Sequence, residues 1–173
     1  MVAEMNLAQI VIEALMFVFP AYCANAVPVI VGGGHPMDFG RNFLDGRPVF
    51  GKNKTFRGFF SGFAVGTAAG LAETAVFGLA SFPALLGVLL SLGALMGDLA
   101  GAFLKRRLGI APGNLLPVMD QIDFIVGAIL FSLPVSLPLL SWEIVVAVLT
   151  ITPPVHLLTN FAAYKLGLKS NPW

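Results

Sequence analysis

Five long apolar segments separated by short polar connections dominate this 173-residue chain. Charged residues make up only 11% of the sequence and hydrophobic residues 57%, whereas a soluble domain carries about 25% charged residues. Roughly 20 apolar residues span the hydrocarbon core of a bilayer. We therefore predict one all-α domain, residues 1–173, that forms a bundle of five transmembrane helices. The predicted spans are Met5–Val31, Gly58–Phe82, Pro83–Leu104, Phe124–Leu140 and Ile144–Leu166.

The ends and irregularities of these helices have sequence signals of their own. The hydroxyl of Thr55 is predicted to cap the second helix by accepting a backbone N–H. The fourth segment is the shortest and carries Pro134 and Pro138, so it should stop early or kink. Pro153 and Pro154 predict a bend or break in the fifth segment, because proline removes a backbone donor and crowds the preceding turn.

Glycines recur at every fourth position in the second and third segments. Residues four apart stack on one face of a helix, and glycine there lets two helices approach closely. The pattern predicts helix packing, with a groove for a lipid chain as the alternative, and it leaves a homodimer open. The glycines are Gly58, Gly62, Gly66 and Gly70, followed by Gly93, Gly97 and Gly101.

The ten Lys and Arg residues lie on alternate connections only. They fall within residues 32–57, within residues 105–107, and at Lys165 and Lys169. By the positive-inside rule this distribution predicts a multi-pass cell-membrane protein with its N-terminus outside and its C-terminus and basic loops in the cytoplasm. The net charge of +1 makes nucleic acid an unattractive partner.

Isolated polar residues leave alternatives open. Glu13 and Glu73 lie at predicted membrane depth, where a charged acid is costly; they are either protonated or paired inside the bundle, or part of a proton path. The single cysteine, Cys23, excludes an intramolecular disulfide and a cysteine metal site. His35 and His156 have no partner at ligand spacing, so we expect packed or interfacial residues rather than bases.

The connection between the third and fourth segments gathers carboxylates and cations. Asp120 and Asp123 are three residues apart, which places both on one helix face. A helix N-terminus favours anions, and paired carboxylates suit Mg²⁺. Asp98 either joins this metal site or forms a salt bridge with Lys105 or Arg106, because an acid within apolar sequence needs a partner.

The first basic loop contains a near match to a phosphate-binding pattern. Residues 46–53 follow G-x-x-x-x-G-K-[ST], except that Asn53 replaces the final Ser or Thr. A P-loop requires a strand and a helix of a soluble α/β unit, so that fold is rejected here. Exposed glycine N–H groups together with Arg47, Lys52 and Lys54 nevertheless suit a triphosphate.

Taken as a set, these motifs resemble a known enzyme family. Gly97-Asp98, Lys105-Arg106, Pro112-Gly113 and Asp120-x-x-Asp123 are similar to the signature of the CTP:phosphatidate cytidylyltransferases, or CDP-diacylglycerol synthases. Gln121 stands where the bacterial type has arginine. The chain length, the five-helix layout and the run from Gly51 to Gly58 resemble the archaeal branch, the CDP-archaeol synthases.

The resemblance implies Mg²⁺-dependent transfer of a cytidylyl group from CTP to 2,3-di-O-geranylgeranylglyceryl phosphate, which gives CDP-archaeol and pyrophosphate. It implies catalytic roles for Asp98, Asp120, Asp123, Lys105 and Arg106, with the three aspartates as metal ligands. It also implies that CTP or the lipid phosphate contacts Arg47, Lys52, Asn53, Lys54, Thr55, Arg57, Pro112 and Gly113. Weaker candidates for positioning the loop or substrate are Asp38, Asn42 and Asp45.

Three other functions compete with this one. A CDP-diacylglycerol synthase acting on phosphatidic acid would use the same polar residues, because apolar helices do not distinguish lipid chains. A CDP-alcohol phosphotransferase is disfavoured, since apolar residues follow Asp123 and the next acid is Glu143. A small transporter is motivated by Glu13, Glu73 and the prolines of the fifth segment.

Overall fold

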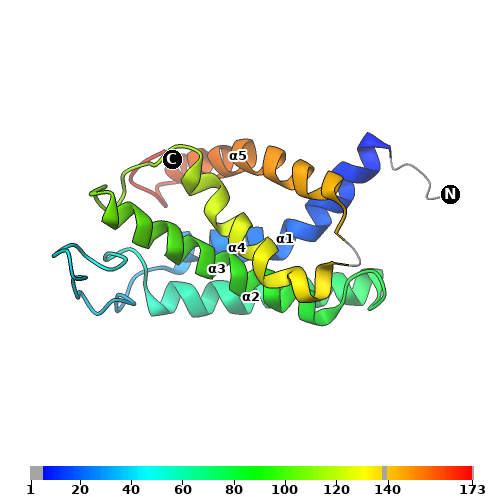
Figure 1. Ribbon diagram of the computed structural model, residues 1–173, viewed down its shortest axis with the longest axis horizontal. Helices are drawn as coiled ribbons and strands as arrows, with labels where there is room; N and C mark the ends of the chain where they lie inside the picture. Colours follow the sequence, from blue (N-terminus) through cyan, green and yellow to red (C-terminus); the bar gives the residue numbers. More distant parts are fainter. Residues whose placement is uncertain (1–5, 138–139, 173) are drawn as a thin grey trace.

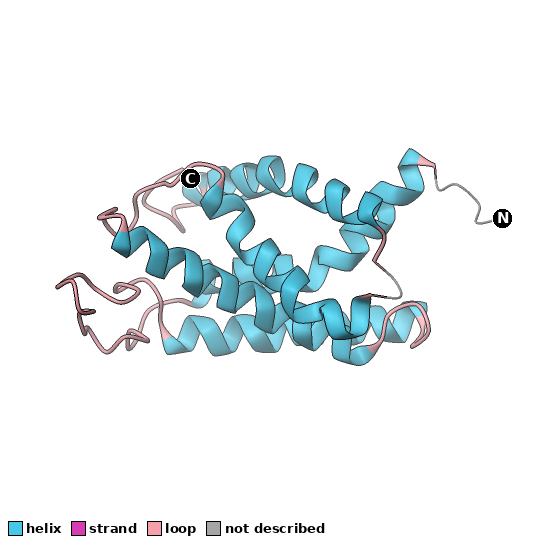
Figure 2. Ribbon diagram, viewed as in Figure 1, coloured by secondary structure: helices cyan, strands magenta, loops and turns pink. Residues whose placement is uncertain are grey.

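A computed structural model of the protein describes residues 6–137 and 140–172. Its helices are α1 (Leu7–Val31), α2 (Phe56–Phe77), α3 (Ala84–Arg107), α4 (Met119–Ser136) and α5 (Trp142–Lys165). All five are long and apolar enough to cross a membrane, and no strand occurs within these two ranges. Figures 1 and 2 show the helices as an elongated bundle. The predicted fold class is confirmed.

The helix limits differ from the predicted ones where local conformation overrides hydropathy. Helix α2 ends at Phe77 because Gly78 takes a φ of +86° and its N–H bonds back to Thr74. Helix α4 begins at Met119, five residues before the predicted span, and ends at Ser136, as expected for a short segment. Pro138 lies outside the described residues.

Of the bend or break predicted for the fifth helix, the break is wrong. Helix α5 continues through Pro153 and Pro154. The hydroxyl of Thr152 donates to the carbonyl of Val148 at 2.6 Å and lies 2.9 Å from the hydroxyl of Tyr22 on α1. Side-chain hydroxyls and neighbouring helices can support proline inside a transmembrane helix in this way.

Glycine faces hold the bundle together, as the spacing predicts. A Cβ on Gly62 would lie 2.5 Å from the carbonyl oxygen of Ala24 on α1. A Cβ on Gly70 would lie 2.5 Å from the Cα of Gly87 on α3. These distances are shorter than van der Waals contact, so the two faces bring backbones together and leave no groove for a lipid chain there.

The apolar core lies where α1, α3, α4 and α5 meet. Helix α1 contacts each of the other four helices, and α3 packs between α2 and α4. The most deeply buried large side chains include Leu86 and Leu90 of α3 and Phe124 and Ile125 of α4. In a membrane such side chains stabilise the bundle by van der Waals packing between helices, because lipid chains are as apolar as they are.

The two acids expected at membrane depth differ in their surroundings. Glu13 is exposed on the outer surface of α1, so the expectation of an interior position is wrong for this residue. Glu73 is buried on α2, and its Oε2 has no hydrogen-bond partner among the described residues. Of these two acids, Glu73 is the one whose carboxyl is destabilised by burial without a hydrogen bond to its Oε2.

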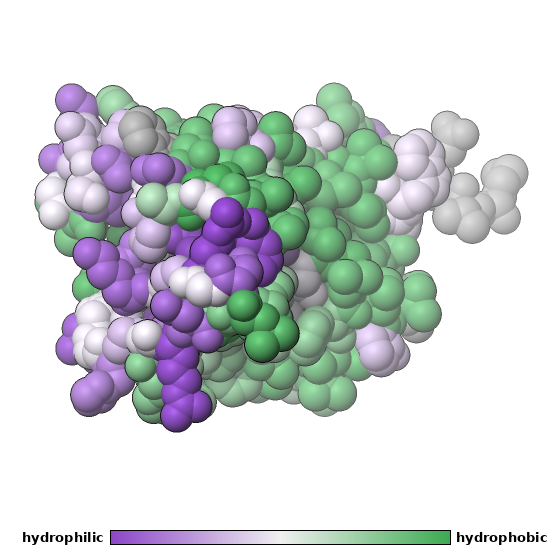
Figure 3. Space-filling model, turned by 60° about the vertical axis from the view of Figure 1, so that its left-hand side comes forward, coloured by the Kyte–Doolittle hydropathy of each residue, from purple (hydrophilic) through white to green (hydrophobic). Residues whose placement is uncertain are grey.

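The polar connections gather at one end of the bundle. Residues 32–55, 108–118 and 166–172 lie together at the left of Figure 1, whereas the 78–83 turn and the start of α1 lie at the other end. Figure 3 shows hydrophilic residues concentrated on the first end and hydrophobic residues over the rest of that face. Segments far apart in sequence thus meet at a single polar surface.

Asp38 organises the loop between α1 and α2. Its Oδ2 accepts the backbone N–H groups of Phe50 at 3.0 Å and Gly51 at 2.7 Å, and its Oδ1 accepts that of Gly40 at 2.9 Å. Burial raises the pKa of this carboxyl, but the backbone N–H groups outweigh burial and leave the pKa below its ordinary value. The charged side chain thus fixes the backbone at Gly40 and at the two residues just before Lys52.

An Asp38→Asn variant should be less stable by about 2 kcal/mol at pH 7, because hydrogen bonds to a charged acceptor are stronger than those to a neutral one. The lowered pKa means that the charged form stabilises the fold above the unfolded pKa of about 4, and that this contribution is lost as the pH falls through the folded pKa. Thermal unfolding in detergent from pH 7 to pH 3 measures the effect. A difference between variant and wild type that does not shrink with falling pH would contradict it.

Candidate active site

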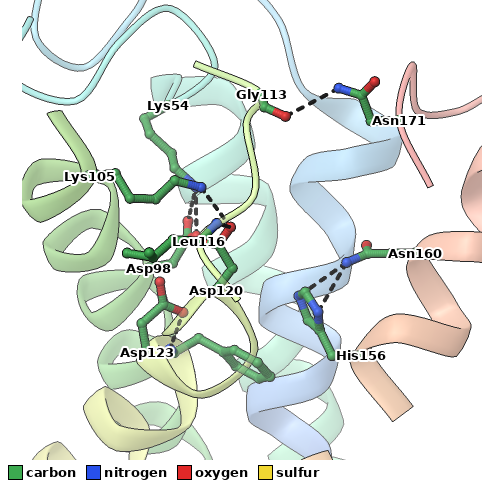
Figure 4. Close-up of polar contacts among 11 residues, drawn as sticks. Lys54, Asp98, Lys105, Gly113, Leu116, Asp120, Asp123, His156, Asn160 and Asn171 are labelled. Atoms are coloured by element: carbon green, nitrogen blue, oxygen red, sulfur yellow. Dashed lines mark hydrogen bonds and ion pairs between the residues drawn. The ribbon is translucent and has the colours of Figure 1, made fainter. Parts of the chain in front are cut away.

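Two ion pairs lie at the polar end of α3 and α4. The Nζ of Lys54, just before α2, is 2.6 Å from both carboxylate oxygens of Asp98 on α3. The Nζ of Lys105 on α3 is 2.6 Å from Oδ2 of Asp120 on α4. Figure 4 shows both lysines directed onto these carboxylates. Asp98 therefore pairs with Lys54, and the alternative pairing with Lys105 or Arg106 is wrong.

Asp123 completes the group of carboxylates. It follows Asp120 by one turn on α4, and its Oδ1 accepts the N–H of Phe124 at 2.6 Å. Its side chain packs on Gly101 of α3, where a Cβ would lie 2.8 Å from the Asp123 Cγ. The charges of Asp98 and Asp120 both act on the Asp123 carboxylate. We call Asp98, Asp120, Asp123, Lys54 and Lys105 the charged cluster.

Arg106 stands beside this cluster with unused hydrogen-bonding capacity. Arg106 is 5% exposed, and its Nε and Nη1 have no hydrogen-bond partner among the described residues. A Cβ on Gly51 would lie 3.7 Å from Nη1, so the glycine-rich loop passes directly over the guanidinium. Buried unsatisfied donors are costly, and an anion would satisfy them.

The remaining candidate substrate residues are of two kinds, those near the clefts at the polar end and those whose hydrogen bonds go to the backbone. Lys52 and Pro112 line a cleft with Asp38 and Gly51, which brings the first loop against the 108–118 loop. Asn53 lines a second cleft beside Lys54 and Asp98. Gly113 accepts a hydrogen bond from Asn171 at 3.2 Å. Of these residues, Asn53 faces an opening that residues of the charged cluster also line.

Three other predicted residues hold the scaffold. The hydroxyl of Thr55 accepts the N–H of Gly58 at 3.2 Å, as its predicted capping role requires. Arg57 donates to the carbonyls of Val31 and Gly32 at the end of α1. Arg47 donates to the carbonyls of Arg106 and Arg107 at the end of α3. In this structure their hydrogen bonds go to backbone and not to an open site.

The weaker candidates of the first loop also have structural partners. Asp45 accepts a hydrogen bond from Arg107 at 2.7 Å, and the Arg107 guanidinium stacks on Phe43. Asn42 pairs with Pro48 in an isolated bridge. Together with Asp38, these contacts position the loop, which is one of the two roles expected for them.

Sequence reasoning did not indicate that α5 and the segment after it lie near the charged cluster. The ring of His156 lies 5.9 Å from that of Phe124, as expected for a packed residue, and 3.1 Å from the Nδ2 of buried Asn160. Lys169 interacts electrostatically with Asp120 and Asp98. No motif surrounds Lys169 in the sequence, so only the chain reversal after α5 shows where it lies.

The donor chemistry of the cluster suits Mg²⁺, because carboxylate oxygens are its preferred protein ligands. In the described part of the chain, however, no three acidic, histidine or cysteine side chains are grouped to hold a metal ion. Figure 4 shows that the ammonium groups of Lys54 and Lys105 instead contact Asp98 and Asp120. A divalent cation would have to share or replace these lysine contacts.

The fold and site together define a multi-pass membrane protein whose polar end gathers carboxylates and cations. The family model described as CarS-like CDP-archaeol synthase matches residues 7–173. The chain belongs to this family of membrane enzymes. Among the predicted alternatives, the small transporter is therefore excluded.

Individual relatives agree with this assignment. The CDP-archaeol synthase of Methanococcus aeolicus is 43% identical over 180 residues, covering 98% of this chain and 100% of the relative. That of Thermofilum pendens is 48% identical, covering 94% and 81%. A solved structure of an intramembrane enzyme for archaeal membrane lipid biosynthesis is 38% identical, with a TM-score of 0.78, covering 87% of this chain and 94% of that one.

Proposed function

We propose that this protein transfers a cytidylyl group from CTP to 2,3-di-O-geranylgeranylglyceryl phosphate, giving CDP-archaeol and pyrophosphate. The observation that carries the proposal is the charged cluster with Arg106 at the polar end of an apolar bundle. A lipid phosphate anchored by its chains reaches this depth, and a nucleotide reaches it from the aqueous side. Membership in the CDP-archaeol synthase family supports the choice of nucleotide and lipid.

The proposed reaction needs positioning and charge neutralisation more than a base. An oxygen of the lipid phosphate attacks the α-phosphorus of CTP, and the bond from that phosphorus to the oxygen bridging to the β-phosphorus breaks. A phosphate monoester has a second pKa of about 6, so much of it is a dianion at pH 7 and is already nucleophilic. Lys52, Lys105 and Arg106 hold the triphosphate, and Lys54 contacts the triphosphate or the lipid phosphate.

We assign Asp98, Asp120 and Asp123 as the residues that would hold Mg²⁺. The metal would neutralise charge at the α-phosphorus and on the leaving pyrophosphate. Phosphate oxygens offer Lys54 and Lys105 new partners, which would free the carboxylates from their present ion pairs. The basic loops that form this site are proposed to face the cytoplasm, where CTP is made, in agreement with the positive-inside rule.

Pyrophosphate release by the purified protein in detergent tests the proposal. Release should require CTP, Mg²⁺ and lipid phosphate together, and chelation with EDTA should abolish it. The geranylgeranyl ether phosphate should be a better substrate than phosphatidic acid. Faster release with phosphatidic acid would instead favour the CDP-diacylglycerol synthase reaction, and no release with either lipid from folded protein would refute cytidylyl transfer.

A further inference from the structure

The chain reverses direction directly after α5. Gly167 has a φ of +73°, a left-handed conformation that glycine adopts without strain. The N–H of Leu168 donates to the carbonyl of Ala163 at 2.9 Å, and that of Gly167 donates to Tyr164 at 3.0 Å. This pair of hydrogen bonds is typical of a glycine-terminated helix. The reversal sends residues 168–172 back toward the polar end of α3 and α4.

The returning segment docks on the loop between α3 and α4. The Nδ2 of Asn171 donates to the carbonyl of Gly113 at 3.2 Å, and Figure 4 shows the two segments side by side at this point. Gly113 belongs to the Pro112-Gly113 pair, and Pro112 lines the cleft beside Lys52. The segment after α5 therefore touches a loop of the candidate active site.

Lys169 lies on this docked segment and is only partly exposed. Its ammonium group interacts electrostatically with Lys54 and Lys105 as well as with Asp120 and Asp98. Burial lowers its pKa from the ordinary value, and the nearby Lys54 charge lowers it further. Lys169 is thus within electrostatic range of Lys54 and Lys105, which come from two other segments, and of the two carboxylates with which they pair. An anion bound among the lysines would offset both the burial and the mutual repulsion of these cations.

We propose that Lys169, held in place by the Asn171–Gly113 contact, binds a phosphate group of a substrate from the side of the site opposite the first loop. The proposal rests on the proposed function for the identity of the substrates, CTP and a lipid phosphate. Whether the substrate is CTP or the lipid phosphate, the group that Lys169 binds is a phosphate anion. The segment after α5 then closes one side of the active site. The basic residues within 32–57 and 105–107 alone leave that side open.

A Lys169→Met variant tests the proposal against Lys165→Met as the matched control. Lys165 lies on the last turn of α5 with its Nζ 5.4 Å from the centre of the Phe161 ring, and it is exposed. Losing one charged hydrogen bond to phosphate should raise a KM about tenfold. A rise for CTP alone assigns Lys169 to the triphosphate, and a rise for the lipid alone assigns it to the lipid phosphate. Lys169→Arg should recover most of the loss.

Binding of inorganic pyrophosphate, measured by calorimetry, separates this proposal from the proposed function because it requires no turnover. Lys169→Met should weaken pyrophosphate binding or, if the lysine serves the lipid, weaken binding of a soluble lipid-phosphate analogue. Asn171→Ala should give a smaller defect in the same ligand. The proposal is overturned if Lys169→Met matches Lys165→Met in both KM values and both binding constants, with an unchanged melting temperature.

Discussion

An Asp123→Asn variant is expected to lose about a hundredfold in the rate of cytidylyl transfer while it remains folded. The amide keeps the size of the carboxylate and can still accept the N–H of Phe124. What it removes is one negative charge from the group with Asp98 and Asp120, and therefore one proposed ligand for Mg²⁺. Because those neighbours repel the Asp123 charge, the melting temperature should stay constant or rise.

Steady-state rates over a range of Mg²⁺ concentrations measure this effect. The Mg²⁺ concentration for half-maximal rate should increase in Asp123→Asn. The control is Asp45→Asn, which removes a half-exposed carboxylate paired with Arg107 in the first loop and should leave the Mg²⁺ dependence unchanged. Wild-type turnover and Mg²⁺ dependence in Asp123→Asn would remove Asp123 from the site.

Gly101→Ala is expected to reduce both stability and activity although it adds a single methyl group. The new Cβ would lie 2.8 Å from the Cγ and 3.0 Å from the Cβ of Asp123. Overpacking of this kind costs about 1–3 kcal/mol. Helix α4 carries Asp120 as well, so moving Asp123 away from α3 also disturbs the Lys105–Asp120 pair. We expect at least about a tenfold loss of rate, since an ångström of misplacement can cost more.

Ala100→Val on the same helix is the matched control. Ala100 is exposed, so a valine there adds its methyl groups outside the helix interface. The melting temperature and the rate of pyrophosphate release should both change for Gly101→Ala and stay near wild type for Ala100→Val. Equal behaviour of the two variants would mean that the α3–α4 interface tolerates the extra volume and that Gly101 does not set the position of Asp123.

Several elements could be predicted because their causes are local. The cap at Thr55 depends on residues three positions apart, and the glycine faces depend on a spacing of four. A break at Pro153 does not occur: α5 is continuous, and Thr152, the residue before the prolines, contacts Tyr22 of α1, which the local sequence does not indicate. Hydropathy also misplaced the end of α2, since Gly78 terminates the helix by its conformation and not by its polarity.

In the candidate site too, some features follow from the local sequence and others depend on the tertiary structure. Asp98, Asp120 and Asp123 indicate a functional site from the sequence alone. A carboxylate at the edge of an apolar helix is costly unless it has a partner or a role in binding or catalysis. Their partners were not predictable in the same way. Lys54 reaches Asp98 from 44 positions away. Lys105, only seven residues from Asp98, is with Arg106 one of the partners that the sequence suggests.

The sequence by itself determined five membrane-spanning helices, the confinement of the cations to one end and the family signature, since hydropathy and periodicity act over one or two turns. Only the tertiary structure decided which lysine meets which aspartate and that Arg47 and Arg57 bind the ends of helices. It also brings Lys169 within electrostatic range of the charged cluster. The physical reason is that long flexible cations choose partners by distance in space. That distance is fixed by the glycine contacts between helices and by the chain reversal at Gly167.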